Sequence, residues 1–160
     1  MKKTRKYIFA AALLSGMLLI GGCKGKQDAE ASGKASPMRE AHEKYIANLT
    51  ANDTTEVLAL CKNFLSSLHE GNFDEAVAGI YQLDSVGTPQ RLGDAEIASL
   101  RRRTTLFPVV SYKFEDMTFF MPDENTVTFN VAFNSDTPPA TMGWGFRPVL
   151  IDGKWYLTFL

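Results

Sequence analysis

Hydrophobic side chains recur with two different periods along this chain. Between residues 56 and 107 they return every three to four positions, which is the spacing of helices that bury one face. Gly71 ends the first of these runs, Asn72 can cap the second, and Pro108 ends the third. We therefore predict three helices, at residues 56–68, 73–81 and 95–107.

After Pro108 the period shortens to two, the period of strands, in which successive side chains face opposite sides of a sheet. The alternation predicts four strands, at about residues 110–120, 126–133, 144–150 and 155–159. Asp152-Gly153 is typical of a tight hairpin turn between the last two. Helices followed by antiparallel strands give an α+β fold, in which the helices pack on one face of a curved antiparallel sheet of about four strands.

The two faces of this predicted sheet differ in chemistry. One face carries the aromatic residues Phe129, Phe133, Trp144, Phe146, Trp155 and Phe159. The other carries the polar positions Thr128, Asn130, Arg147, Lys154, Tyr156 and Thr158. Because each aromatic side chain buries about 150–250 Å², the first face should dominate the core. The second face should meet water or a partner, and Thr128, Arg147 and Tyr156 are the candidates for an interface there.

The first 23 residues follow another pattern. Four basic residues lie within positions 2–6, an apolar run of 14 residues spans 7–20, and Gly21-Gly22-Cys23 closes it. A membrane-spanning helix needs roughly 20 apolar residues, whereas the core of a signal peptide needs about 7 to 15. We therefore expect residues 1–22 to be a signal peptide that is removed.

The stretch Leu19-Ile20-Gly21-Gly22-Cys23 resembles the lipobox of bacterial lipoproteins. The resemblance implies cleavage before Cys23 and acyl chains on its sulfur, and two or three such chains hold a protein on a membrane stably. Lys24 stands where an aspartate usually retains enterobacterial lipoproteins at the inner membrane, so we expect an outer-membrane location in the bacterial cell envelope. The alternative is that Cys23 lies beside a conventional cleavage site.

Composition divides the rest of the chain. Residues 24–37 contain no large apolar side chain, so we expect 23–53 to be a lipidated cysteine and a flexible tether, with a short helix near 38–49. Residues 54–160 are enough for one domain with its own core. Cys61 is the only other cysteine, so no intrachain disulfide can form once Cys23 is lipidated. It falls within a predicted apolar helix face, which suggests a buried, inert thiol.

Charge disfavours a nucleic-acid partner. The first 22 residues hold four of the 17 basic side chains and none of the 18 acidic ones, which leaves a formal net charge of −5. After residue 22 the only basic cluster is residues 101–103, and three successive helical residues point in different directions, so they make no continuous binding stripe. No spacing of His, Cys, Asp and Glu suits a metal site, and we assign no cofactor and no catalytic residue.

The order of elements and three phrases resemble the superfamily of cone-shaped domains named for nuclear transport factor two, also called ketosteroid-isomerase-like or cystatin-like. The phrases are FLSSLHEGNFDEA (64–76), DENTVTF (123–129) and DGKWYL (152–157). Behind a lipobox they are similar to the small lipoprotein members of that superfamily. The resemblance implies a sheet curved around a concavity, and we name Tyr81, Tyr112, Trp144 and Phe129 as candidate lining residues.

These observations lead us to expect an envelope lipoprotein, anchored to the membrane through lipid on Cys23, whose domain binds an unidentified small ligand or envelope protein without catalysis. One alternative is an isomerase or dehydratase-like enzyme that uses Tyr81 or Tyr112 with Asp84 on a small apolar substrate. Another is a structural module that forms a homodimer through its sheet.

Overall fold

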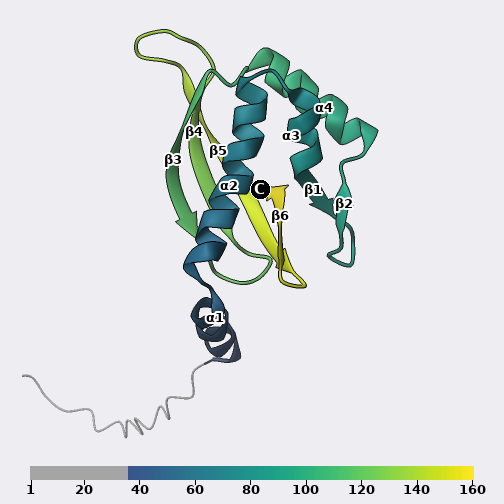
Figure 1. Ribbon diagram of the computed structural model, residues 1–160, viewed down its shortest axis with the longest axis vertical. Helices are drawn as coiled ribbons and strands as arrows, with labels where there is room; N and C mark the ends of the chain where they lie inside the picture. The colour runs from purple at the N-terminus through teal and green to yellow at the C-terminus, as the bar shows by residue number, and fades with distance from the viewer. Residues whose placement is uncertain (1–35) are drawn as a thin grey trace, which may run out of the picture. The chain divides into compact units, whose positions relative to one another are not determined.

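Residues 36–160 are described by a computed structural model and form four helices and six strands (Figure 1). The elements are α1 (Pro37–Asn48), α2 (Ala51–His69), α3 (Phe73–Gly79), β1 (Ile80–Leu83), β2 (Pro89–Arg91), α4 (Asp94–Leu106), β3 (Ser111–Thr118), β4 (Thr126–Ala132), β5 (Thr141–Ile151) and β6 (Lys154–Phe159). The expected signal peptide and Cys23 lie outside the described residues. Within them, no helix combines the length and apolar character that crossing a membrane requires.

The strands form one sheet in the order β2-β1-β6-β5-β4-β3, in which only β1 and β6 run parallel. The α+β class is confirmed, but the prediction of about four antiparallel strands was wrong, because the sheet has six strands and is mixed. The two missed strands are β1 and β2, of four and three residues. Tyr81 belongs to β1 and not to a helix, since α3 ends at Gly79.

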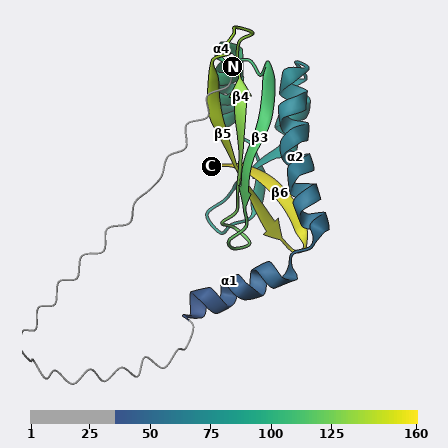
Figure 2. The same ribbon diagram turned by 90° about the vertical axis from the view of Figure 1, so that its left-hand side faces the viewer.

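The long helix α2 lies along one side of the sheet (Figure 2). It begins earlier than predicted because Thr50 and Asp53 form a reciprocal capping box, with the backbone N–H of Thr50 donating to the Asp53 carboxylate over 2.7 Å. Phe64 of α2 meets Phe146, Trp144 and Phe159 edge to face, with ring centroids 5.5–6.0 Å apart. These contacts hold the predicted aromatic face of the sheet against the helix.

Helix α1 packs against the same folded unit through its last turns. The Tyr45 hydroxyl donates to Asn125 Oδ1 over 3.0 Å, and both residues are buried. A ring nitrogen of His42 lies 2.8 Å from the carbonyl oxygen of Phe120. Asn125 also accepts from the Phe120 N–H and donates to the carbonyls of Pro122 and Pro148. It therefore joins α1, the turn before β4, and β5.

Helix α4 lies beside the end of β5 that has no neighbouring strand on its β6 side. Strand β6 pairs with β5 only from Phe146 to Ile151, so residues 141–144 of β5 have no β6 partner. In Figure 1, α4 lies beside this upper part of β5, above the ends of β6 and β1. The space between α4 and the ends of these strands contains the candidate site.

Candidate functional site: a groove beneath α4

A cavity of about 390 Å³ lies under α4, at the ends of β1 and β6. Its lining is Tyr81, Gln82, Leu83, Leu92, Glu96, Ser99, Leu100, Arg103, Arg147, Thr158, Phe159 and Leu160. Leucine and aromatic side chains thus surround a small set of polar groups. This size and composition are typical of pockets that hold small ligands, which measure about 300–1,000 Å³.

A second cavity of about 460 Å³ adjoins the first along α4. It is lined by Arg103, Phe107, Met142, Gly143, Trp144, Gly145, Phe159 and Leu160. Because Arg103, Phe159 and Leu160 border both cavities, we treat the two as one feature, the α4 groove. It runs from Tyr81 to the part of β5 that β6 leaves unpaired.

Two residues of the groove lining carry a buried hydrogen-bond donor that has no partner among the described residues. The atoms are Nε of Arg147 and Nε1 of Trp144, and both are closed to solvent and do not themselves face the open groove. A buried polar atom without a partner costs about 1–3 kcal/mol, so each such atom in a folded protein calls for an explanation. In both cases the missing partner is a hydrogen-bond acceptor.

The positive charges of the groove also lack protein partners. The salt bridges of the described chain join Arg39 to Glu43 and Arg101 to Asp74, and neither includes Arg103 or Arg147. Glu96 is the one acid in the lining, and its carboxylate lies near Gly93 at the start of α4. It precedes Arg103 by two helical turns, which is about 10 Å along the axis. The Arg103 end of the groove is therefore cationic.

The structure brings together only part of the predicted pocket. Tyr81 lines the first cavity and Trp144 the second. Phe129 is fully buried, and the Tyr112 ring packs edge to face on it with centroids 6.1 Å apart, so these two residues line neither cavity. That the site binds anything stays a prediction.

The predicted interface residues Thr128, Arg147 and Tyr156 share one face of the sheet, as the strand register shows. Tyr156 meets Tyr81 edge to face at 5.1 Å, and the Lys154 ammonium lies 4.9 Å from the Tyr156 ring centre. Arg147 lies at the border of this face and the groove, since it also lines the first cavity. Whether this face binds a partner stays a prediction.

Sequence reasoning missed the contribution of α4. Glu96, Ser99, Leu100, Arg103 and Phe107 all border the groove, and their spacing is that of one helix face. The arginines of residues 101–103 are all exposed, as a solvated helix face would be, and Arg101 pairs with the Asp74 carboxylate. What the sequence did not show is that Arg103 also borders the groove. The signal that could have shown this is the apolar Leu100, three residues before Arg103.

Asp84, the acid of the enzymatic alternative, lines neither cavity of the α4 groove. Asp84 is fully exposed in the β1–β2 turn, where its carboxylate accepts the backbone N–H groups of Val86 and Thr88. These bonds, led by the one from Thr88, hold the pKa of Asp84 below its usual value. The register places Tyr81 and Tyr112 on opposite faces of the sheet.

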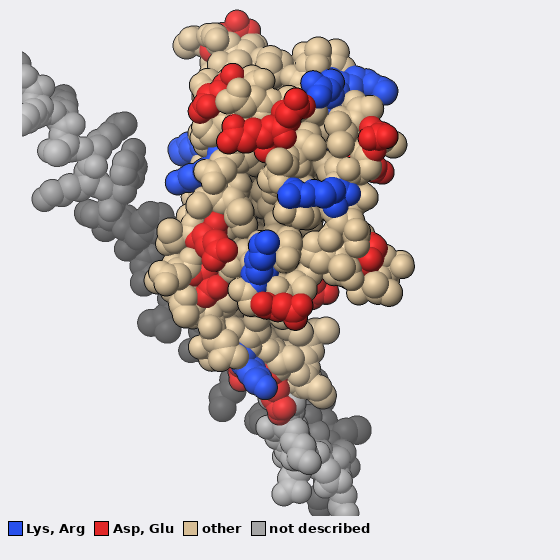
Figure 3. Space-filling model, turned by 45° about the vertical axis from the view of Figure 1, so that its right-hand side comes forward, with Lys and Arg blue, Asp and Glu red and all other residues tan. Residues whose placement is uncertain are grey.

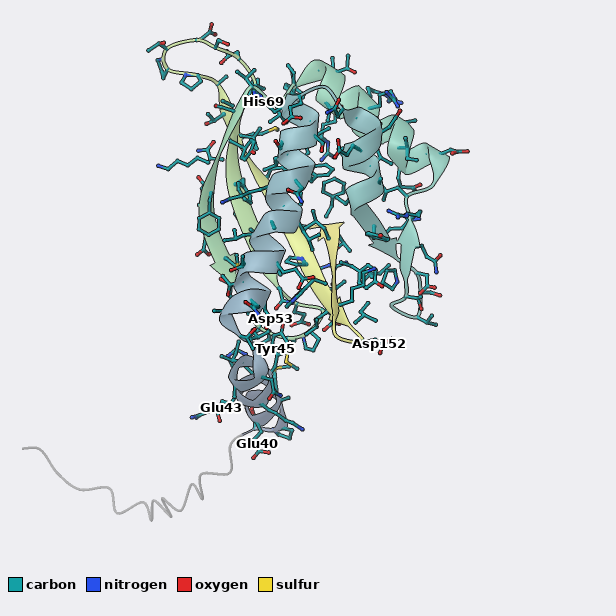
Figure 4. All side chains as sticks on the ribbon, in the orientation of Figure 1. Glu40, Glu43, Tyr45, Asp53, His69 and Asp152 are labelled. Atoms are coloured by element: carbon teal, nitrogen blue, oxygen red, sulfur yellow. The ribbon has the colours of Figure 1, made fainter. Side chains whose placement is uncertain are left out.

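The remaining reactive side chains have structural surroundings. Cys61 is buried within α2, and its burial raises the pKa of the thiol to about 12. A ring nitrogen of His69 lies 3.1 Å from the Val109 carbonyl oxygen, at the far end of α2 from Asp53 (Figure 4). Among residues 36–160 there is no cluster of three or more potential metal ligands. The face shown in Figure 3 has basic and acidic side chains interspersed, without one large patch of either sign.

No family model and no curated protein matches the chain. Among solved structures, it is similar to an NTF2-like protein of unknown function from Shewanella oneidensis MR-1, with 16% identity, a TM-score of 0.46, and coverage of 66% of this chain and 93% of that one. It is also similar to a protein from Campylobacter jejuni described as a candidate NTF2-like transpeptidase, with 19% identity, a TM-score of 0.42, and coverage of 65% and 98%. Identity at this level concerns the fold and says nothing of activity.

Proposed function

We propose that the protein is a lipid-anchored component of the bacterial cell envelope, located at the outer membrane, whose folded domain binds a small ligand in the α4 groove and performs no catalysis. The observation that carries the binding role is a groove of ligand size whose lining arginines, Arg103 and Arg147, form no salt bridge among the described residues. The anchoring role rests on the order of basic residues, apolar run and Gly-Gly-Cys at positions 2–23.

The two parts of this proposal belong to different segments of the chain. Acyl chains on Cys23 would hold the protein at the bilayer, and residues 24–36 separate that cysteine from α1 in the sequence. The groove would then sample ligands at or near the membrane surface. Asp84 lies outside the groove lining, and this counts against the enzymatic alternative at the α4 groove.

Substitution Cys23→Ser tests the anchor, because serine removes the sulfur that carries the lipid. We expect the wild-type protein to sediment with membranes through a high-salt wash and to dissolve only in detergent, and the variant to leave the membrane fraction. The matched control is Cys61→Ser, which removes the buried thiol of α2 and should leave sedimentation unchanged. A Cys23→Ser protein that still sediments like the wild type would overturn the anchoring role.

A homodimer is a second candidate, favoured by the half-buried Tyr81–Tyr156 pair on the sheet face that also carries Thr128 and Arg147. Tyrosine and arginine are enriched in protein interfaces. Sedimentation equilibrium of the detergent-solubilised protein tests it. A dimer that Tyr156→Ser disrupts supports this role, and a monomer at all concentrations contradicts it.

A further inference from the structure

The α4 groove combines an apolar wall with unpaired positive charge, and this combination restricts what it can bind. Leu83, Leu92 and Leu100 supply hydrocarbon surface from β1, the following loop and α4. Arg103 and Arg147 supply two guanidinium groups that form no salt bridge among the described residues. A neutral apolar ligand would leave these charges unused, and a small polar anion would leave the leucines exposed.

The two guanidinium groups specify the polarity of the ligand. Arginine carries only N–H donors and cannot accept a hydrogen bond. Oxygen acceptors on a ligand would pair with Arg103 and Arg147, whereas an amine would not. A guanidinium binds the paired oxygens of a carboxylate or phosphate through two parallel bonds, so an acidic oxygen group suits this end of the groove.

We propose that the α4 groove binds an anionic amphiphile, a molecule whose acidic oxygen head is held by Arg147 and Arg103 and whose hydrocarbon body lies against the leucines and Phe159. This inference rests on the proposed function and names the ligand class for the same site. Cavities of about 390 and 460 Å³ have room for a hydrocarbon chain of medium length. The Arg91 guanidinium lies over the ring of Tyr81, which lines the first cavity, so it adds positive potential near the groove.

The Trp144 indole provides a site-specific signal. The protein has two tryptophans. Nε1 of Trp155 donates to Asp53 Oδ1 over 2.9 Å at the start of α2, while Nε1 of Trp144 has no partner within residues 36–160. The full-length protein, labelled with ¹⁵N-tryptophan and held in nanodiscs of zwitterionic lipid, should therefore show two indole resonances. Octanoate is the first probe. It should shift the Trp144 resonance saturably and leave the Trp155 resonance in place.

Four ligands of related structure separate head from body. Octanoate and octyl phosphate share the body and differ in the acidic head, octanol has the body without charge, and acetate has the head without the body. We expect octanoate or octyl phosphate to bind at least tenfold more tightly than octanol and acetate, and the tighter of the two identifies the head. Empty nanodiscs, titrated in parallel, correct for ligand that partitions into lipid.

Two variants locate the head group. Arg147→Gln and Arg103→Gln should each weaken octanoate binding at least tenfold and leave octanol binding unchanged. The matched control is Arg39→Gln, which removes an exposed arginine of α1 that pairs with Glu43 outside the groove, and it should bind like the wild type. Because the ligand series uses the wild-type protein, the test holds even where a variant folds poorly.

The outcomes separate this inference from the proposed function. If octanol binds as tightly as octanoate, or if Arg147→Gln and Arg103→Gln bind octanoate normally, the groove is a binding site but the anionic class is wrong. If none of the four ligands moves the Trp144 resonance, this inference fails, and the groove loses its support as the binding site. Neither result bears on the anchor, which Cys23→Ser tests separately.

Discussion

Removal of the Asn125 side chain should destabilise the fold more than any other asparagine substitution in the described chain. The side chain is 1% exposed and makes four hydrogen bonds, of which two are accepted by Oδ1 and two are donated by Nδ2. At about 0.5–1.5 kcal/mol for each bond, Asn125→Ala should cost about 2–6 kcal/mol of unfolding free energy. The upper half of this range applies if the Pro148 carbonyl and the Tyr45 hydroxyl stay buried without partners.

The assay is urea denaturation of the full-length protein in a non-ionic detergent, followed by tryptophan fluorescence. Tyr45→Phe removes one of the four bonds and should cost about 1 kcal/mol. In the Asn125→Ala background the same change should cost much less, because its partner is already absent. The matched control is Asn72→Ala, whose exposed side chain forms no helix-cap bond, and it should cost less than about 0.5 kcal/mol. An Asn125→Ala protein that loses under 1 kcal/mol would refute this reasoning.

Three further predictions concern α2. The hydrogen bond from Trp155 and, after it, the bonds from Thr50 lower the pKa of Asp53, so the ionised side chain stabilises the fold above the unfolded pKa of about 4, and this contribution is lost as the pH falls through the lower folded pKa. The stability difference between wild type and Asp53→Asn, measured in urea from pH 7 to 2.5, should therefore shrink below about pH 4, and a constant difference would contradict this. Cys61 should resist a thiol reagent at pH 8 until urea unfolds the protein, because burial raises its pKa to about 12, and rapid labelling in the native state would show that it is accessible. Phe64→Ala should cost about 3–5 kcal/mol in urea denaturation, since Phe64 is 2% exposed and touches three aromatic rings, and a cost near 1 kcal/mol would show that the aromatic face collapses around the gap.

The long elements of the fold were predictable because their apolar period extends over many residues. The runs that contain Phe64 and Ala76 form α2 and α3, the run that contains Leu100 forms α4, and the alternation after Pro108 forms β3 to β6. The aromatic face was also assigned correctly where it is deepest, since Phe129 and Phe146 are fully buried. These are local patterns, because each can be recognised within a single helix or strand without knowledge of the rest of the fold.

The short strands and the groove depend on contacts between distant residues. Ile80 and Tyr81 fit a helical period as well as a strand, and their pairing with β6 and β2 decides between the two. The alternation of side chains along β5 predicts that Arg147 lies on an open sheet face, but the position of α4 makes it part of a groove. Asn125 sits in a turn motif, and its burial depends on Tyr45, 80 residues earlier in the chain. A period of two or 3.6 residues carries no information about such pairs.

The central claim of this account is that the folded domain is held to a membrane by lipid on Cys23. The most direct measurement is the mass of the amino-terminal peptide of protein purified from bacterial membranes. The account predicts a peptide that begins at Cys23 and carries a diacylglycerol, with or without an acyl chain on the amino group. A peptide that begins at any other residue, or that contains Cys23 as a free thiol, would contradict it.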